Sequence, residues 1–122
     1  MMAGCHMVEI SGRIRSNYWI EKDGEVILSE WRVALLEAVE RTGSINAAAA
    51  QRGVHFRVAW RKLKEMEDRL GVKLTERTTG GIRGGGTRLT IEGKECVRRF
   101  RHFSRGLKDI VEQRFHESFE RH

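Results

Sequence analysis

The stretch from residue 44 to residue 71 leaves few folds open to this chain. Ser44 is a residue type that caps helices, and INAAAAQR at 45–52 predicts a short helix that Gly53 ends. A longer helix is predicted to open at His55, run to Leu70 and stop at the next glycine. Its apolar residues recur at helical spacing and predict one buried stripe, made of Ala59, Leu63, Met66 and Leu70. Two helices joined by a tight glycine turn predict a helix-turn-helix.

The segment before this pair predicts a β-hairpin over 12–28 followed by a helix. Asp23-Gly24 is a strong hairpin-turn signal, and Trp19 lies on the face opposite the alternating residues Ile14, Tyr18 and Ile20. Ser29 then caps a helix that Thr42-Gly43 closes. Its apolar residues again follow helical spacing, and these are Trp31, Ala34, Leu35, Ala38 and Val39.

The pattern changes to β-like after residue 72. VKLTERTT and TRLT flank GGIRGGG at 80–86, which has five glycines in seven residues. A glycine-rich loop between two short strands predicts a mobile hairpin, or wing. A nucleotide-binding loop is a poor alternative, because the Gly-Lys-Ser/Thr ending that cradles phosphate is missing.

Residues 91–119 predict a long helix capped by Thr90. Its apolar stripe recurs every three or four residues and consists of Val97, Phe100, Phe103, Leu107, Ile110 and Val111. A stripe of this length resembles a coiled-coil seam, which favours a homodimer that covers it with a second copy. Packing of the first half on the chain's own core is the alternative. Gly93 and Gly106 each weaken such a helix by about 1 kcal/mol.

The expected fold is therefore mainly α with small β: a winged helix-turn-helix with an N-terminal β-hairpin, a glycine-rich wing and a long C-terminal dimerisation helix. The expected organisation is a flexible tail at 1–11, the winged helix-turn-helix domain at 12–90 and the dimerisation helix at 91–122. A chain of 122 residues suits one such compact domain.

The charge is concentrated in the middle of the chain. The net charge is +6, and residues 51–88 alone carry ten basic and four acidic side chains, while residues 1–50 are net acidic. Such a concentration is expected of a surface that meets a polyanion. A solubilising face is the alternative.

Several other classes of protein are disfavoured. The two cysteines, Cys5 and Cys96, are too far apart for a metal cluster or a disulfide framework and predict free thiols. The five histidines lack metal-ligand spacing, and no catalytic set is evident, so we expect no cofactor, no metal and no enzymatic activity. No apolar stretch approaches the roughly 18 residues that cross a bilayer. The N-terminus lacks the basic region and apolar core of a signal peptide, which favours a cytoplasmic protein.

In a helix-turn-helix the second helix enters the major groove with its first turns at the base edges. Arg57, Arg61 and Lys64 stand opposite the Leu63 stripe at i, i+4 and i+7. The arginine fork suits guanine, whereas Lys64, lower on the helix, suits phosphate. A solvated helix face is the alternative for all three.

The opening turns of the same helix and its flanks supply further candidates. His55 and Phe56 begin the helix, and Phe56 suits a thymine methyl. Trp60 either contacts DNA in the major groove or packs between helices. Phosphate contacts are expected from Ser44 and Asn46, although Ser44 also caps its helix, and wing contacts from Thr79, Arg83 and Arg88. The alternative for the wing is a solvated loop.

These residues resemble a known family. GSI at 43–45 with the alanines that follow, Ala59-Trp60 with Glu65-Met66, and ERTTGGIRGGGTRLT at 76–90 are similar to the N-terminal DNA-binding domain of ModE-type molybdate-responsive regulators. The resemblance covers about residues 12–115, and a more distant one links the chain to the LysR-type helix-turn-helix. It implies a winged helix, dimerisation through the long helix and N-terminal strands, and palindromic DNA.

The leading hypothesis is a sequence-specific DNA-binding transcriptional regulator that acts as a homodimer on double-stranded DNA. We expect a stand-alone DNA-binding domain, with no molybdate-binding domain in this chain and no membrane partner. The alternative is a winged-helix module that binds a protein instead of DNA.

Overall fold

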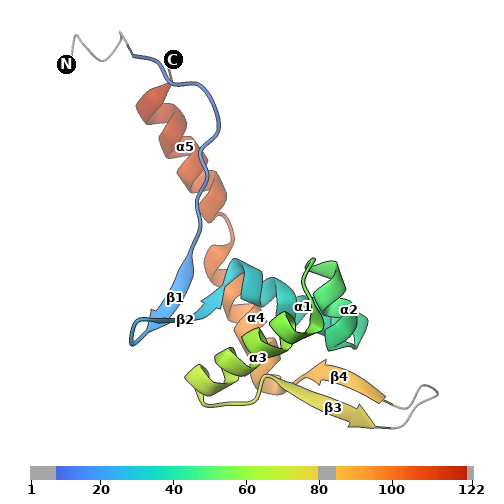
Figure 1. Ribbon diagram of the computed structural model, residues 1–122. Helices are drawn as coiled ribbons and strands as arrows, with labels where there is room; N and C mark the ends of the chain where they lie inside the picture. The colour runs from blue at the N-terminus through green and yellow to red at the C-terminus, as the bar shows by residue number, and fades with distance from the viewer. Residues whose placement is uncertain (1–7, 80–84, 121–122) are drawn as a thin grey trace. The chain divides into compact units, whose positions relative to one another are not determined.

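The computed structural model describes residues 8–79 and 85–120. They fall into two compact units (Figure 1). The larger is Tyr18–His102, and the smaller joins the residues up to Asn17 to those from Phe103 onward. The larger unit contains all the residues of the predicted helix-turn-helix, 44–71.

Three helices form the centre of the larger unit: α1 (Glu30–Thr42), α2 (Ile45–Gln51) and α3 (Phe56–Leu70). The Ser29 hydroxyl accepts a hydrogen bond from the Arg32 N–H, and the Ser44 hydroxyl accepts one from the Ala47 N–H, so both predicted N-caps are confirmed. Gly43 and Gly71 end α1 and α3 in the left-handed region, as predicted. His55 precedes α3 as its N-cap residue and makes no capping hydrogen bond with its side chain.

The first hairpin pairs β1 (Trp19–Lys22) with β2 (Glu25–Ser29), antiparallel. Asp23 and Gly24 form its turn with φ values of 53° and 79°, which confirms the turn signal. The hairpin is shorter than the predicted 12–28, and residues 12–18 belong to no strand. The reason is that β2 ends at Ser29, where α1 begins, so the earlier residues have no partner strand.

The wing pairs β3 (Thr75–Thr79) with β4 (Gly85–Leu89), antiparallel. Its tip, with Ile82 and Arg83, lies outside the described residues. The Thr87 N–H donates to the Gly43 carbonyl at 2.9 Å, which fixes β4 against the turn between α1 and α2. A Cβ at Gly86 would lie 2.5 Å from that same carbonyl, so this close approach requires glycine.

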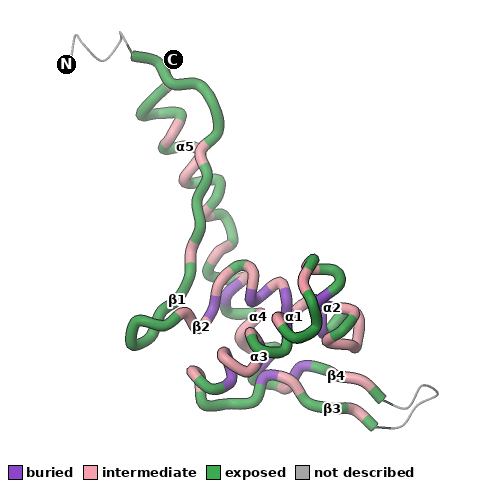
Figure 2. The backbone as a smooth tube through the Cα atoms, in the orientation of Figure 1, coloured by how far each residue is buried: buried purple, intermediate pink, exposed green. Residues whose placement is uncertain are grey.

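The core lies where α1, α2 and α3 meet, and Figure 2 shows the buried positions running along these helices. Ala59, Leu63 and Met66 are buried and Leu70 is partly buried, which confirms the predicted stripe. Leu74, directly before β3, and Leu89 of β4 close the core on the side of the wing. All fourteen buried apolar residues of the described chain lie in the larger unit: Leu28, Val33, Leu35, Leu36, Ala38, Val39, Ala48, Ala49, Ala59, Leu63, Met66, Leu74, Leu89 and Phe100.

The predicted helix over 91–119 is two helices, α4 (Ile91–Ser104) and α5 (Leu107–Phe119). Gly106 interrupts it with a φ of 81°, a conformation that glycine adopts without steric cost. Phe100, predicted to face a partner, is only 3% exposed and belongs to the core, and Val97 packs against that core. These two residues therefore follow the alternative in which the first half of the stripe packs within the domain.

The smaller unit contains α5 and the residues before β1. Ile110 and Phe119 are about half exposed, whereas Leu107 and Val111 are partly buried. The Ile10 N–H donates to the Phe119 carbonyl at 3.2 Å, so the start of the described chain contacts the end of α5. Of the flexible tail predicted at 1–11, residues 1–7 lie outside the described residues. No described helix is long and apolar enough to cross a membrane.

Candidate nucleic-acid interface

The outward face of α3 carries two arginines that have no partner among the described residues. Arg57 and Arg61 stand one helical turn apart, and both are exposed because the opposite face of α3 is buried through Leu63. Neither side chain makes a hydrogen bond or ion pair with any residue that the structure describes. Both guanidinium groups are therefore available to an external anion or acceptor.

Lys64, the third cation predicted on this face, is already engaged. Its ammonium lies 3.4 Å from a carboxylate oxygen of Glu67 and 5.4 Å from the centre of the Trp60 ring. The Lys64 side chain is 39% exposed, so it reaches the surface while remaining held at both sides. Trp60 itself is 47% exposed, which places it at the surface of α3 and not between helices.

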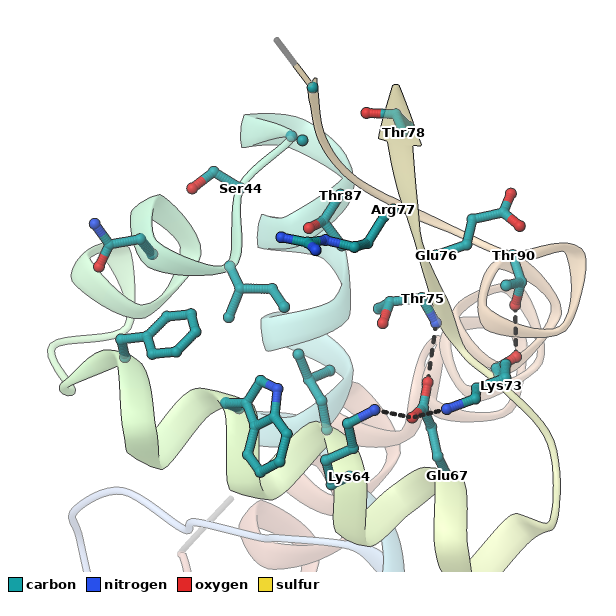
Figure 3. Close-up of a pocket in the computed structure, with 18 of the residues that line it drawn as sticks. Ser44, Lys64, Glu67, Lys73, Thr75, Glu76, Arg77, Thr78, Thr87 and Thr90 are labelled. Carbon is teal, nitrogen blue, oxygen red and sulfur yellow. Dashed lines mark hydrogen bonds and ion pairs between the residues drawn. The ribbon is translucent and has the colours of Figure 1, made fainter. Parts of the chain in front are cut away.

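Glu67 joins the recognition helix to the wing (Figure 3). Its buried carboxylate accepts hydrogen bonds from the backbone N–H groups of Leu74 at 2.8 Å and Thr75 at 3.2 Å. Lys73 lies 3.8 Å from the same carboxylate. Our sequence reasoning missed Glu67, although it lies four residues after Leu63, where helical spacing puts a side chain beside the buried stripe.

An open groove separates α3 from the wing, with the start of α2 at one end. Three cations line it, Lys64, Lys73 and Arg77. Two carboxylates, Glu67 and Glu76, line it as well. The lining also includes two aromatic side chains, Phe56 and Trp60, and hydroxyl groups from Ser44, Thr75, Thr78, Thr79, Thr87 and Thr90. Cations and hydroxyl groups are the side chains that hydrogen-bond phosphate and sugar oxygens.

Arg77, like Lys73, is a cation of this groove that our sequence reasoning missed. It lies opposite Thr87 in the wing ladder, is exposed, and makes no hydrogen bond or ion pair within the described chain. Arg88, which we predicted as a wing contact, is instead bound to Glu76 with Nε and Oε2 2.8 Å apart. Arg88 is not among the residues that line the groove, because it occupies the next position of the pleat, on the other face of the hairpin.

The other predicted contacts fall at or beside the groove. Thr79, Asn46 and Phe56 line it, and so does Ser44, whose hydroxyl also caps α2. His55 is exposed at the start of α3. The structure thus brings six of the eleven predicted contacts into the groove. Outside its lining are His55, Arg57, Arg61 and Arg88, while Arg83 lies outside the described residues.

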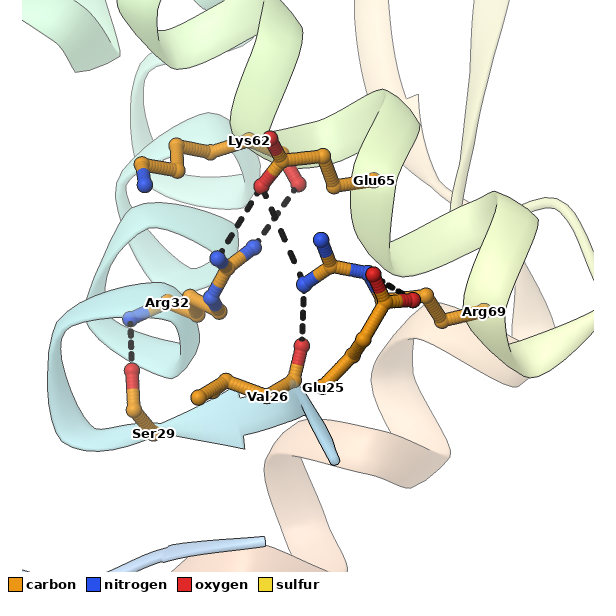
Figure 4. Close-up of polar contacts among 7 residues, drawn as sticks. All are labelled: Glu25, Val26, Ser29, Arg32, Lys62, Glu65 and Arg69. Carbon is orange, nitrogen blue, oxygen red and sulfur yellow. Dashed lines mark hydrogen bonds and ion pairs between the residues drawn. The ribbon is translucent and has the colours of Figure 1, made fainter. Parts of the chain in front are cut away.

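A second set of arginines is used to hold α3 in place (Figure 4). Arg32 of α1 is buried and donates to the Lys62 carbonyl at 3.3 Å and to a Glu65 carboxylate oxygen at 3.0 Å. Arg69 donates to the Val26 carbonyl of β2 at 2.6 Å. Partial burial raises the pKa of Glu65, but the hydrogen bond from Arg32 and nearby positive charges outweigh it and lower that pKa overall.

Arg101 fixes α4 to α1 in the same way. Its guanidinium donates to both carboxylate oxygens of Glu37, at 3.0 and 2.6 Å, and to Glu30 at 2.7 Å. These hydrogen bonds hold the pKa of Glu37 below its ordinary value. Arg32, Arg69 and Arg101 are therefore structural cations, in contrast to Arg57, Arg61 and Arg77, which have no such partner in the described chain.

The larger unit is a winged helix-turn-helix, in which α3 is the recognition helix and β3–β4 the wing. The family described as "Bacterial regulatory helix-turn-helix protein, lysR family" matches residues 32–94, and the chain belongs to this family. These residues therefore form the DNA-binding domain of a transcriptional regulator.

Individual relatives agree with this assignment. The molybdenum transport protein ModE of Azotobacter vinelandii is 39% identical over 82 residues, which is 67% of this chain and 30% of the relative. The transcriptional regulator ModE of Haemophilus influenzae is 46% identical over 88 residues, 72% of this chain and 31% of the relative. This chain thus spans about a third of the length of these curated relatives. The predicted similarity to ModE-type and LysR-type domains is confirmed.

Among solved structures, the DNA-binding domain of CbnR in complex with DNA is 25% identical to this chain. The TM-score is 0.54, and the match covers 69% of this chain and 92% of that domain.

Proposed function

We propose that this protein binds a palindromic operator as a homodimer and reads base sequence with the first turns of α3. The observation that carries the proposal is the pair of unpartnered arginines, Arg57 and Arg61, one turn apart on the outward face of α3. An arginine fork bonds the O6 and N7 atoms of guanine together, and each such contact contributes roughly 1–3 kcal/mol of discrimination. The protein acts by binding, in the cytoplasm, without catalysis.

The wing side of the groove and its end at the start of α2 hold the DNA backbone in this proposal. Arg77 and Lys73 bring positive charge from the wing, and the hydroxyl groups of Ser44 and Thr87 supply hydrogen bonds. Lys64 contributes to the same backbone contact, although its ammonium also forms an ion pair with Glu67. These contacts set the register of α3 on the duplex and carry no base specificity of their own.

Dimerisation rests on α5 in this proposal. Ile110 is half exposed in the middle of that helix, with Leu107 and Val111 one turn or less away. A second copy would cover these side chains, and Phe103, in the last turn of α4, belongs to the same predicted apolar stripe. Two recognition helices would then meet half-sites about 34 Å apart, one turn of DNA.

Selection of bound duplexes from a random pool, followed by mobility shifts, tests the proposal. We expect Arg57→Ala and Arg61→Ala to change the preferred sequence, and Lys64→Ala to weaken selected and scrambled duplexes alike. The wild-type affinity should fall with salt, with a log–log slope of about −0.9 per phosphate contact. Equal losses on both duplexes for all three variants, or a flat salt series, would refute base reading by α3.

A further inference from the structure

We propose that Phe56 and Trp60 select thymine in the operator by contacting its C5-methyl group. This inference rests on the proposed DNA binding and adds a second, apolar mode of base reading to that of the arginines. It makes both aromatic side chains specificity-determining residues.

The two rings form one exposed aromatic surface on α3. Phe56 is 45% exposed and Trp60 is 47% exposed, and a spacing of four residues puts both on the same side of the helix. Both line the groove that faces the wing. Neither ring belongs to the buried core of the larger unit, so internal packing does not account for their place at the surface.

The charged residues around the two rings indicate which kind of partner the rings contact. Arg57 and Arg61 each follow an aromatic residue by one position, and Lys73 and Arg77 line the same groove from the wing. With Lys64, these five cations outnumber the two carboxylates that line the groove, Glu67 and Glu76. A surface of net positive charge favours a polyanion over an apolar protein partner. The one apolar group that a base pair displays in the major groove is the thymine C5-methyl.

Trp60 is also held ready for such a contact. The Lys64 ammonium lies over its ring, 5.4 Å from the centre, and Glu67 holds that ammonium at 3.4 Å. Glu67 is in turn anchored to the backbone at Leu74. Because this chain of contacts restrains the indole before DNA arrives, less conformational freedom is lost on binding.

The test replaces thymidine by deoxyuridine, which removes only the methyl group. A duplex selected from a random pool is resynthesised with deoxyuridine at each thymine position in turn, and its affinity for wild-type protein, Phe56→Ala and Trp60→Ala is measured. Val72→Ala serves as the matched control, because Val72 is 40% exposed but does not line the groove. Circular dichroism verifies that each variant is folded.

We expect wild type and Val72→Ala to bind the uracil duplex about fourfold more weakly for each methyl group that is read. Phe56→Ala and Trp60→Ala should each lose the preference for thymine over uracil at those positions where the removed ring contacts the methyl group. If wild type prefers the selected duplex over a scrambled one but tolerates uracil everywhere, methyl reading is refuted and the proposed function stands. Uracil discrimination that persists in both variants also refutes it. If wild type does not prefer the selected duplex, the proposed function fails, and this inference with it.

Discussion

The Glu67 carboxylate of α3 accepts the backbone N–H of Leu74 at 2.8 Å and so ties the recognition helix to the first residues of the wing. The neighbouring N–H of Thr75 binds the same oxygen at 3.2 Å. A single buried side chain thereby sets the position of one wall of the groove relative to the other. We therefore expect the DNA contacts proposed for the two walls to be coupled through it.

Replacement of Glu67 tests this coupling. Glu67→Ala leaves two backbone N–H groups without their acceptor, and we expect it to lower the free energy of unfolding by about 2 kcal/mol. Asp68→Ala is the control, because Asp68 is exposed on the same helix. Urea denaturation measures both variants. Equal stability of the two would show that the Glu67 hydrogen bonds do not hold the wing.

Arg77→Ala should weaken binding to all DNA sequences about equally. Arg77 lines the groove and makes no internal ion pair in the described chain, so its loss removes one phosphate contact. The log–log salt slope should become less steep by about 1. Arg98→Ala is the control, because the Arg98 side chain is 66% exposed but lies outside the groove. A changed base preference in Arg77→Ala would assign Arg77 to base reading instead.

Gly86→Ala should destabilise the protein more than Gly53→Ala does. The new Cβ at position 86 meets the Gly43 carbonyl at 2.5 Å, and relief of this clash costs about 2–3 kcal/mol. Gly53 has a φ of 72° with no atom near its added Cβ, so its alanine variant carries backbone strain alone, of about 1 kcal/mol. Thermal unfolding of both variants gives the comparison, and the reverse order would contradict the close approach of β4 to the α1–α2 turn.

The Glu37–Arg101 contact should contribute less stability at acid pH. Because Arg101 lowers the pKa of Glu37 in the folded protein, the unfolded chain binds a proton more readily. The contribution is present above roughly pH 4.3, the ordinary pKa of a glutamate, and is lost as the pH falls through the folded pKa. Both side chains are one-third exposed, so we expect at most about 1 kcal/mol at neutral pH.

Glu37→Gln measures this contribution directly. Wild type should exceed the variant in free energy of unfolding at pH 7, and the difference should shrink toward pH 3. A difference that stays the same at both pH values would mean that the Glu37 charge has no part in it.

Ile110→Asp should convert a dimer into monomers, because it puts a charge into the apolar face proposed to meet a second copy. Lys108→Asp is the matched control, since position 108 lies nearly opposite Ile110 around α5. Sedimentation velocity distinguishes the two states. A variant that sediments as wild type would remove α5 from the interface.

Much of the fold could be predicted from local signals in the sequence. The caps at Ser29 and Ser44 and the glycines at 43 and 71 act through their own backbone neighbours, so their positions were predictable. The stripe through Leu63 was predictable for the same reason, because helical spacing alone decides which side chains share a face. The outward placement of Arg57 and Arg61 followed directly from that stripe.

Whether each cation is ion-paired depended on contacts that only the tertiary structure provides. Lys64 and Arg88 looked as free in the sequence as Arg61, yet each lies against a carboxylate. Arg77 looked like an ordinary strand residue, and the folded wing puts it into the groove. The strand ladder decides the Arg88–Glu76 pair, because it joins residues 12 apart in the sequence.

The C-terminal helices also show which features the sequence could predict and which required the tertiary structure. Apolar periodicity predicted the residues of the stripe over 97–111, but it could not tell which of them pack inside the protein. Burial of Phe100 depends on the core that forms where α1, α2 and α3 meet, and the break at Gly106 depends on a φ value that no spacing encodes. The sequence by itself determined which residues are helical, capped and outward on α3. The tertiary structure decided which cations remain free for DNA, because ion pairing depends on distances between residues that are remote in the chain.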